Sequence, residues 1–343
     1  LYNITLVLLD SDNEYAYRLK KNVNIVQLTF NSSFAKSLVS MYAFPAKVLK
    51  KLSVNSFIAY YDFISNCVTN VFEKTYDIAI DFYGYGSFVT AFLATKIQAK
   101  KKATWLHDEK PYWMKSVQKY LCEYDKIYGV SQAVVDAFCR EYPHYKDKAA
   151  VFYNVIDIEQ IKRKSEQDEI IPFKESFNIV TVGRLTEQKG YDIAIKAASI
   201  LKKRKINFAW YAIGGGRDEK KLKKLVEKYC LENQFVFLGR KKNPYPYMKH
   251  CDLYVQPSRH EGYVITLVEA RALCLPILSS DIPSAREQIQ DGINGYIAEL
   301  SAEDLADKIE YLYNNPSQRK KTVEYLKEHP IDFSTELLKL EII

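Results

Sequence analysis

Two acidic residues, Glu261 and Glu269, lie eight positions apart in the stretch SRHEGYVITLVEARALCLPILSS. Apolar residues recur at helical spacing within this stretch, which predicts a helix that begins near Val264. Glu261 then lies on the loop before the helix, and Glu269 lies in its second turn. Carboxylates placed in this way could bind sugar hydroxyls on either side of a phosphate. A surface helix carboxylate and a carboxylate favoured by the helix dipole explain the same pattern.

The start of that predicted helix could also bind an anion. The first amide groups of a helix have no partner within it, and they point outward with the positive end of the helix dipole. The amides in question belong to Val264, Ile265 and Thr266.

Two cations follow an earlier predicted strand, in TVGRLTEQKGYD. Gly183 ends the strand, Arg184 and Lys189 follow it, and Gly190 opens the next helix. Two cations beside a helix N-terminus can neutralise a diphosphate, because Arg offers a fork of donors and Lys a point charge. Each charge-assisted hydrogen bond contributes roughly 1.5–3 kcal/mol. An ordinary loop with solvated cations is the alternative.

A triple glycine follows the next predicted strand, in AIGGGRDEKKL, and includes Gly214 and Gly215. Glycines at a strand end let the backbone approach a ligand closely, or they simply make a tight turn. The spacing is not G-x-G-x-x-G, so the motif alone leaves both interpretations open.

In the first half of the chain, KATWLHDE places His107 at the end of a predicted strand. A lone histidine there is most often structural, but a strand end that faces a cleft can bring it to a ligand. Asp108 and Glu109 follow it. Either carboxylate could orient an acceptor, and the sequence does not choose between them.

The sequence offers little for a metal. Asp10, Ser11 and Asp12 spell D-x-D after an apolar strand, a pattern that can hold a metal against phosphates and that a polar turn also explains. The remaining histidines show no metal-ligand spacing; they include His144, His250 and His260. We therefore expect no metal and no resident cofactor.

Short apolar strands alternate with helical stretches along the whole chain. Several strands are near-continuous apolar runs, as expected when helices cover both faces of a parallel sheet. The first series comprises 5–10, 23–28, 76–82, 102–107 and 126–131, and the second 178–183, 208–214, 235–239, 253–258, 276–280 and 295–300. Repeated β-α units of this kind predict an α/β fold with doubly wound, Rossmann-like sheets. Ligands of such sheets bind beyond the carboxyl ends of the strands.

The two series predict two domains, since 343 residues exceed one ordinary hydrophobic core. A polar, charged stretch from residue 158 to 176 is expected to link them. We place an N-terminal domain at 1–165, a C-terminal domain at 173–325 and a final helical segment at 326–343. Ser131 is a plausible N-cap for the helix that follows it.

Composition indicates a globular chain, with 48% hydrophobic and 27% charged residues. The net charge of +7 fits an acidic partner but does not choose one. Lys-rich stretches at 46–52 and 99–105 leave contact with an anionic membrane open, with a solvated helix face and a loop before a strand as the alternatives. Scattered cysteines and the lack of a long apolar run predict a cytoplasmic protein that does not span a membrane.

Several motifs in order give the sequence a family resemblance. G-R-L-x-x-x-K-G, I-G-G-G, F-L-G, N-P-Y and P-S-x-x-E-G-(x6)-E-A follow one another between residues 177 and 300. This order resembles the donor half of retaining glycosyltransferases of family 4, which have the GT-B fold of two Rossmann-like domains facing across a cleft. The segments ATWLHDE, YDKIYGVSQAVVDAF and VFYNVIDIEQI in the first half are similar more loosely.

The resemblance implies that the domain at 1–165 is the acceptor side and that the domain at 173–325 binds the nucleotide sugar. It also implies roles for particular residues. Arg184 and Lys189 would grip the donor diphosphate, and Glu261 would contact the donor sugar near the reacting centre. Glu269 would bind the nucleotide ribose, and His107 would reach the donor sugar from across the cleft. The resemblance also argues against a metal at the D-x-D motif, and it implies that the last helical segment packs back toward the first domain.

The sequence departs from the family at two places. Val264 stands where the family usually has a small residue or proline, which alters the approach of a phosphate. The chain also enters at what resembles the second strand of the fold, so we expect it to lack the first strand and its Gly-rich loop.

From these features we expect a retaining, metal-independent hexosyltransferase. Its donor would be a nucleoside-diphosphate sugar, with UDP the commonest nucleotide in the family, and its acceptor a glycan or lipid-linked glycan in cell-surface polysaccharide synthesis at the cytoplasmic side of a membrane. We expect catalysis by electrostatic stabilisation of the leaving diphosphate. The alternatives are a sugar-nucleotide epimerase on the same fold, a catalytically degenerate partner subunit and a nucleic-acid binder, the last suggested by charge alone and not expected.

Overall fold

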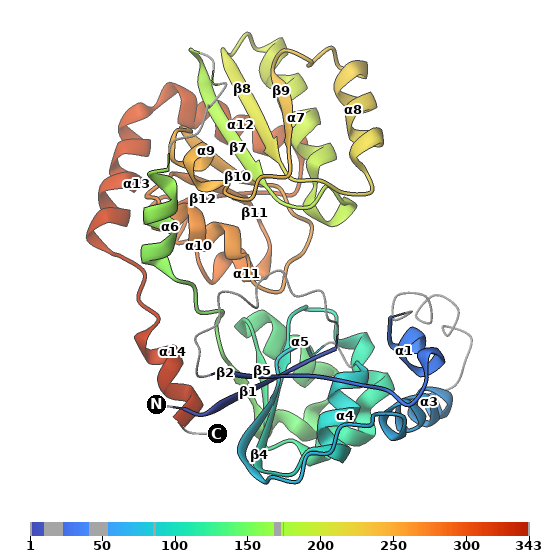
Figure 1. Ribbon diagram of the computed structural model, residues 1–343. Coiled ribbons are helices and arrows are strands. Elements are labelled where there is room, and N and C mark those ends of the chain that lie inside the picture. The colour runs from blue at the N-terminus through green and yellow to red at the C-terminus, as the bar shows by residue number, and fades with distance from the viewer. Residues whose placement is uncertain are drawn as a thin grey trace.

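The computed structural model describes residues 2–9, 23–40, 54–84, 87–167, 173 and 175–341. They form two lobes, each built on a parallel sheet (Figure 1). Every strand predicted from the sequence has a counterpart, and one short strand at 149–151 was not predicted. The D-x-D motif and the Lys-rich stretch at 46–52 lie outside the described residues.

The first lobe carries strands and helices in alternation. Its elements are β1 (Ile4–Leu8), β2 (Val23–Gln27), α1 (Ser33–Ser40), α3 (Val54–Asn66), β3 (Tyr76–Asp81), α4 (Phe88–Lys96), β4 (Ala99–Leu106), the 3-10 helix η4 (Pro111–Glu123), β5 (Lys126–Gly129), α5 (Gln132–Glu141), η5 (Pro143–Lys148) and β6 (Ala149–Val151). Strands β3, β4, β5 and β6 pair in that order, all parallel. The Ser131 side chain accepts a hydrogen bond from the Val134 amide, which confirms the predicted N-cap of α5.

Two details of the first lobe differ from the expectation. β1 and β2 form a separate parallel pair instead of joining the four-stranded sheet, within the part of the chain that the structure describes. The Lys-rich stretch expected as a loop before β4 belongs to the strand, which begins at Ala99. Lys100 and Lys101 there pair with Asp77 and Asp125 on the exposed edge of the lobe.

The second lobe contains a six-stranded sheet with helices on both faces. Its elements are α6 (Ile158–Ser165), β7 (Phe177–Val182), η6 (Glu187–Lys189), α7 (Tyr191–Lys203), β8 (Phe208–Ile213), α8 (Glu219–Lys228), β9 (Phe235–Gly239), α9 (Tyr245–Lys249), β10 (Leu253–Gln256), α10 (Ile265–Ala272), β11 (Ile277–Ser280), α11 (Pro283–Arg286), β12 (Tyr296–Ala298), α12 (Ala302–Asn314) and α13 (Pro316–Glu328). α14 (Ser334–Leu338) and η7 (Lys339–Glu341) follow and lie against the first lobe. The spatial order is β12-β11-β10-β7-β8-β9, and all pairs are parallel.

Strand β8 shows why the sequence of this sheet is apolar throughout. Trp210 and Ala212 face a core shared with α7 and α12, whereas Tyr211 and Ile213 face a second core shared with α9, α10 and α11. Because side chains alternate across a strand, a strand covered on both faces needs apolar residues at every position. All six residues of β8 are buried, as a doubly wound sheet requires.

The stretch expected to link the domains is helical in its first part. The Asp157 side chain caps α6 by accepting a hydrogen bond from the Gln160 amide, and Ile161 is buried on its inner face. α6 packs against α9 and α10 of the second lobe, and the Lys164 carbonyl accepts a hydrogen bond from Asn243. α6 therefore packs with the second lobe, although it precedes the domain boundary predicted at residue 165.

The end of the chain returns to the first lobe (Figure 1). The Glu336 carboxylate on α14 accepts a hydrogen bond from the Tyr153 amide at 3.0 Å, and Lys339 Nζ donates to the Val151 carbonyl at 3.1 Å. Leu340 packs against the core of the first lobe. Across the described ranges, no helix has the length and apolar character needed to cross a membrane.

Candidate functional site

The order of the second sheet creates the place for a ligand. β7 lies between β8, which follows it in the chain, and β10, which begins the other half of the sheet. The helices that follow β7 and β10, α7 and α10, pack on opposite faces of the sheet. Doubly wound sheets bind ligands in the crevice at such a reversal, beyond the carboxyl ends of the strands. The loop after β7 carries Arg184 and Lys189, and the loop after β10 carries Glu261.

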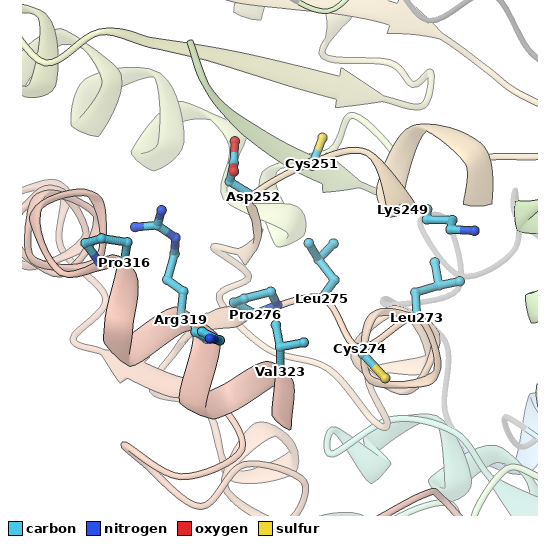
Figure 2. Close-up of a pocket in the computed structure, with 11 residues that line it drawn as sticks. Lys249, Cys251, Asp252, Leu273, Cys274, Leu275, Pro276, Pro316, Arg319 and Val323 are labelled. Carbon is cyan, nitrogen blue, oxygen red and sulfur yellow. The ribbon is translucent and has the colours of Figure 1, made fainter. Parts of the chain in front are cut away.

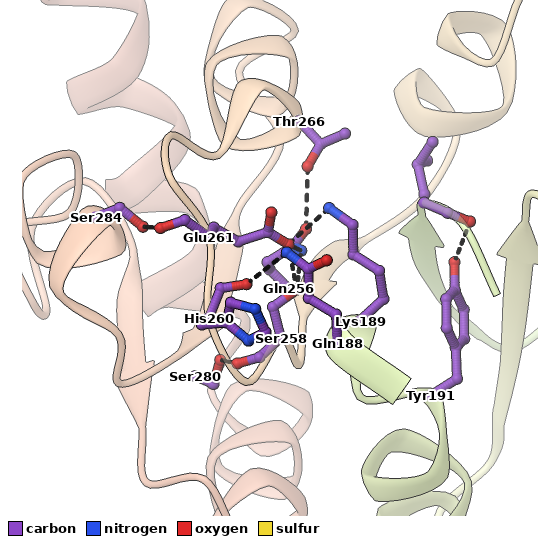
Figure 3. Close-up of polar contacts among 12 residues, drawn as sticks. Gln188, Lys189, Tyr191, Gln256, Ser258, His260, Glu261, Thr266, Ser280 and Ser284 are labelled. Atoms are coloured by element: carbon purple, nitrogen blue, oxygen red, sulfur yellow. Dashed lines mark hydrogen bonds and ion pairs between the residues drawn. The ribbon is translucent and has the colours of Figure 1, made fainter. Parts of the chain in front are cut away.

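An ion pair joins these two loops (Figure 3). Lys189 Nζ lies 2.6 Å from Glu261 Oε1, and the two side chains are only 16% and 9% exposed. The same carboxylate oxygen accepts hydrogen bonds from Ser258 Oγ at 2.7 Å and from Gln256 Nε2 at 3.5 Å. A buried carboxylate needs both a counter-charge and hydrogen-bond donors, and Glu261 has both.

Gln256 connects the ion pair to the start of α10. Its Oε1 accepts hydrogen bonds from Thr266 Oγ1 at 3.0 Å and from the Tyr254 hydroxyl at 2.5 Å, while its Nε2 donates to Ser258 Oγ at 2.6 Å. Gln256 is buried, and our sequence analysis did not select it. A glutamine within the apolar strand LYVQPS was the signal that could have found it, since buried polar groups need partners.

Helix α10 begins at Ile265, as predicted, but one of its three expected anion-binding amides is occupied. Val264 takes φ −86° and ψ 87°, close to an inverse γ-turn. The Ile265 amide consequently donates to the Tyr263 carbonyl at 3.1 Å. The Val264 side chain is buried in the core, whereas that of Ile265 is exposed.

Glu269 lies one turn beyond Thr266, and residues three apart share a helix face. Its Oε1 accepts a hydrogen bond from the Tyr245 hydroxyl at 2.9 Å, so the N-P-Y motif and this carboxylate meet in the fold. Burial raises the pKa of Glu269, and the hydrogen bond from Tyr245 opposes that rise. Glu269 is therefore partly buried, as the carboxylate of a binding site would be.

The two glycine turns lie side by side. The Gly183 amide donates to the Ile213 carbonyl at 3.0 Å, and the Leu185 amide donates to the Gly215 carbonyl at 3.2 Å. A Cβ atom at Gly214 would lie 1.9 Å from the Gly183 carbonyl oxygen, so the two turns are in direct backbone contact. Arg184 projects into solvent from the same loop and makes no ion pair with any residue that the structure describes. Its guanidinium is thus available at the rim of the crevice.

Gly190 fixes the position of Lys189. Its φ is +65°, and a Cβ atom there would lie 1.8 Å from the Pro257 carbonyl oxygen. Only glycine allows the loop after β7 to approach the loop after β10 this closely. Arg259 ties the two loops together as well, through a bidentate pair with Asp192 at 2.8 Å for each bond.

The backbone of His107 contacts the site from the first lobe. A Cβ atom added to Gly262 would lie 1.9 Å from the His107 carbonyl oxygen, so the two backbones are in direct contact across the lobes. The ring nitrogen Nε2 lies 2.7 Å from the Phe82 carbonyl oxygen. Burial lowers the pKa of His107, which favours the neutral ring at pH 7.

A buried acid that the sequence analysis missed shapes the loop beside His107. The Asp81 carboxylate accepts hydrogen bonds from the Gly84 amide at 3.0 Å, Thr90 Oγ1 at 2.6 Å and Thr104 Oγ1 at 2.9 Å. Burial raises the pKa of Asp81. An aspartate at the end of the apolar run YDIAID was its only signal.

A separate hollow of about 330 Å³ lies between α13 and the starts of β10 and β11 (Figure 2). Asp252 and Pro276 in its lining precede those strands, so it opens at their amino ends. Ligands of such sheets bind at the carboxyl ends, which separates this hollow from the crevice. Among the described residues, no three His, Cys, Asp or Glu side chains are grouped so as to hold a metal.

Comparison with known proteins finds similarity in the second half of the chain. Residues 162–329 match the family model described as Glycosyl transferases group 1. An uncharacterized glycosyltransferase of Methanocaldococcus jannaschii is 33% identical over 172 residues, which are 49% of this chain and 40% of that protein.

A second relative has a named activity. It is the N-acetylgalactosamine-N,N'-diacetylbacillosaminyl-diphospho-undecaprenol 4-alpha-N-acetylgalactosaminyltransferase of Campylobacter jejuni, 30% identical over 184 residues, which are 50% of this chain and 49% of that protein. These alignments span only about half the length of the curated relatives.

Among solved structures, Anabaena Alr3699/HepE in complex with UDP and glucose superposes with a TM-score of 0.72 at 18% identity, over 98% of this chain and 90% of that one. At this identity the likeness concerns the fold, which is that of the GT-B glycosyltransferases. The expected GT-B architecture is therefore confirmed.

Proposed function

We propose that this chain is a glycosyltransferase that moves a hexosyl unit from a nucleoside-diphosphate sugar to a glycan or lipid-linked glycan, because residues 162–329 match the family model described as Glycosyl transferases group 1. The observation that carries the proposal is the Lys189–Glu261 pair, which joins two loops at the reversal of the strand order. There a cation, a carboxylate and the start of α10 face one crevice.

The ion pair suggests how the donor binds. Without a ligand, Lys189 neutralises Glu261. A diphosphate arriving in the crevice offers Lys189 a stronger anionic partner, and Arg184 at the rim adds a second cation. Glu261 keeps its hydrogen bonds from Ser258 and Gln256, and its carboxylate can then accept hydrogen bonds from hydroxyls of the donor sugar.

Chemistry in this proposal is mainly electrostatic. As the bond between the sugar and the diphosphate breaks, negative charge grows on the leaving phosphate, and Lys189, Arg184 and the amides at the start of α10 stabilise it. His107, held neutral, faces the donor sugar from the first lobe. Closure of the lobes excludes water and so suppresses hydrolysis of the donor. Glu269 holds the ribose in this proposal, as the family resemblance implies.

The relatives inform the finer assignments. UDP is proposed because it is bound in the Anabaena structure, and a lipid-linked acceptor because the Campylobacter enzyme is named for a diphospho-undecaprenol acceptor. A role in polysaccharide synthesis is proposed because another relative is named a putative colanic acid biosynthesis glycosyltransferase. Retention of configuration and independence from metals are proposed from the family resemblance. Both named relatives are glycosyltransferases, which favours transfer over epimerisation.

A thermal-shift screen of nucleotide sugars tests the donor assignment. We expect UDP and at least one UDP-sugar to raise the Tm of the wild type, and the shift to be lost in Glu269→Ala. Incubation of the stabilising UDP-sugar with a glycan acceptor should give a glycoside whose anomeric configuration, read by NMR coupling constants, matches that of the donor. No Tm shift with any nucleotide sugar contradicts the proposal.

A further inference from the structure

The loop after β4 places a carboxyl group opposite the ion pair. His107, Asp108 and Glu109 form this loop on the first lobe. A Cβ atom at Gly262 would lie 1.9 Å from the His107 carbonyl oxygen and 3.1 Å from the Asp108 amide nitrogen. The loop therefore contacts Gly262, the residue that follows Glu261. It belongs to the first lobe and faces the lobe that carries Lys189 and Glu261.

Glu109 differs from Asp108 in the hydrogen bonds that its carboxyl group accepts. Asp108 Oδ1 accepts a hydrogen bond from the Lys110 amide at 3.0 Å. Glu109 Oε1 is buried and accepts no hydrogen bond from any residue that the structure describes. A buried carboxyl oxygen without a donor is costly, and one that persists in a native fold needs an explanation.

The charges around Glu109 exclude an ion pair as the explanation for its unsatisfied oxygen. Burial and the negative charges of Asp108, Glu287 and Glu261 raise the pKa of Glu109 to about 7, and only Lys110 opposes them. The surroundings supply neither a donor nor sufficient counter-charge. A neutral hydroxyl is the group that could satisfy the oxygen without adding another negative charge.

An exposed aromatic ring beside His107 fits the same kind of ligand. The Phe82 side chain is 58% exposed, and its ring centre lies 5.4 Å from that of His107. Exposed apolar surface beside a polar crevice marks ligand-binding grooves. A sugar offers both hydroxyl donors for a carboxyl group and apolar C–H faces for a ring.

We propose that Glu109 Oε1 accepts a hydrogen bond from a hydroxyl of the acceptor sugar, with the Phe82 ring beneath that sugar, so that Glu109 is the acceptor-binding carboxylate of the loop. This inference rests on the proposed function and deepens it. It also decides between the two acids that the sequence left open, because Asp108 is already engaged by its own backbone.

Binding of simple glycosides tests the inference without knowledge of the natural acceptor. The octyl glycosides of glucose, galactose and N-acetylglucosamine serve as probes, titrated by ligand-observed NMR into the full chain saturated with UDP. The variants are Glu109→Ala, Glu109→Gln, Phe82→Ala and, as the matched control, Asp108→Asn. UDP binding of each is measured separately by calorimetry, and its Tm shows that it folds.

We expect Glu109→Ala to weaken binding of at least one glycoside tenfold or more, because a site built to bond a hydroxyl loses much when either partner is missing. Glu109→Gln, which keeps an oxygen in place, should lose less than Glu109→Ala. Phe82→Ala should weaken binding, and Asp108→Asn should stay within twofold of the wild type. All variants should bind UDP like the wild type.

Three results overturn the inference while the donor assignment stands: glycoside binding by Glu109→Ala within twofold of the wild type, an equal loss in Asp108→Asn, or a wild type that binds UDP but none of the glycosides. A loss of UDP binding in Glu109→Ala also overturns it, since Glu109 would then serve the donor. A wild type that fails to bind UDP contradicts the proposed function and the inference with it.

Discussion

Replacing Lys189 with methionine leaves the buried Glu261 carboxylate with neutral donors alone. Losing one partner of a buried pair costs about 3–5 kcal/mol, which the partial exposure of Lys189 reduces to about 2 kcal/mol. We expect the Tm to fall by about 4–8 °C and the Kd for UDP to rise at least tenfold, because a charge-assisted bond to phosphate is lost.

Differential scanning fluorimetry and calorimetry with UDP measure the two effects of Lys189→Met. Lys203→Met is the matched control, because Lys203 is an exposed lysine on α7. UDP affinity in Lys189→Met equal to that of the control would remove Lys189 from the donor site.

The raised pKa of Glu109 predicts how stability depends on pH. The native state holds the proton of this group up to about pH 7, whereas an ordinary glutamate loses it near 4.5. Between these values the native state binds more protons than the unfolded state, so the stability contributed by this group falls as pH rises. Above pH 7 the full cost of the buried charge is present.

Glu109→Gln should therefore have a higher Tm than the wild type above pH 7, and the difference should vanish below pH 4.5. Solvent screening limits the effect to about 1 kcal/mol, or roughly 2–4 °C. Thermal scans across this pH range measure it, with the exposed Glu303→Gln as the control. A Tm difference that is independent of pH would refute the argument.

At the scale of elements, the loop after β7 depends on Gly190. Alanine there would place its Cβ atom 1.8 Å from the Pro257 carbonyl oxygen, so the two loops must separate. Gly292 has a similar φ of +76° but open space around it. Alanine at Gly292 would therefore cost only the strain of its left-handed backbone conformation, about 1–2 kcal/mol of stability.

We expect Gly190→Ala to lower the Tm by clearly more than Gly292→Ala does, and to weaken UDP binding at the same time. Circular dichroism melts and calorimetry compare the two variants. Equal Tm values would show that the approach of the two loops contributes little to the fold.

The sequence predicted the elements of the second lobe well, and the reason is physical. Each strand there is buried on both faces, so its apolar run is unbroken and easily recognised, as in β8. It also placed Lys189 and Glu261 after strands, where a parallel sheet binds ligands. Their contact could not be predicted from local pattern, because it depends on β10 pairing with β7.

Other features were beyond sequence reasoning for a similar reason. The Glu287 carboxylate accepts bonds from amides more than 150 residues away in the chain, and no periodicity signals such a contact. The turn at Val264 that engages the Ile265 amide depends on backbone angles that the residue types do not fix. The separation of β1 and β2 from the four-stranded sheet likewise involves packing between distant segments.

At the scale of the whole molecule, specific contacts between the lobes hold them together. Tyr153 and Tyr263 lie with ring centres 5.6 Å apart across the lobes, and Glu336 on the returning helix bonds the Tyr153 amide. Glu287 accepts hydrogen bonds of 2.8 Å each from the amides of Gln132 and Ala133. In the described structure the two lobes are therefore in contact with each other.

Glu287→Ala should shift the molecule toward an open arrangement. The carboxylate sits at the N-terminus of α5, where the helix dipole and two amide bonds favour an anion. Losing these contacts should cost about 2 kcal/mol of the contact between the lobes, a shift of roughly thirtyfold in favour of separation. UDP should still bind, because the Lys189–Glu261 pair lies within one lobe.

Small-angle scattering measures this directly as a larger radius of gyration for Glu287→Ala than for the wild type, with Glu303→Gln again as the control. Transfer to a glycan acceptor should slow while hydrolysis of the donor rises relative to transfer, since an open crevice admits water. An unchanged radius and an unchanged ratio of hydrolysis to transfer would mean that the contact of Glu287 with α5 does not control closure, and that the two lobes are held by the returning helix instead.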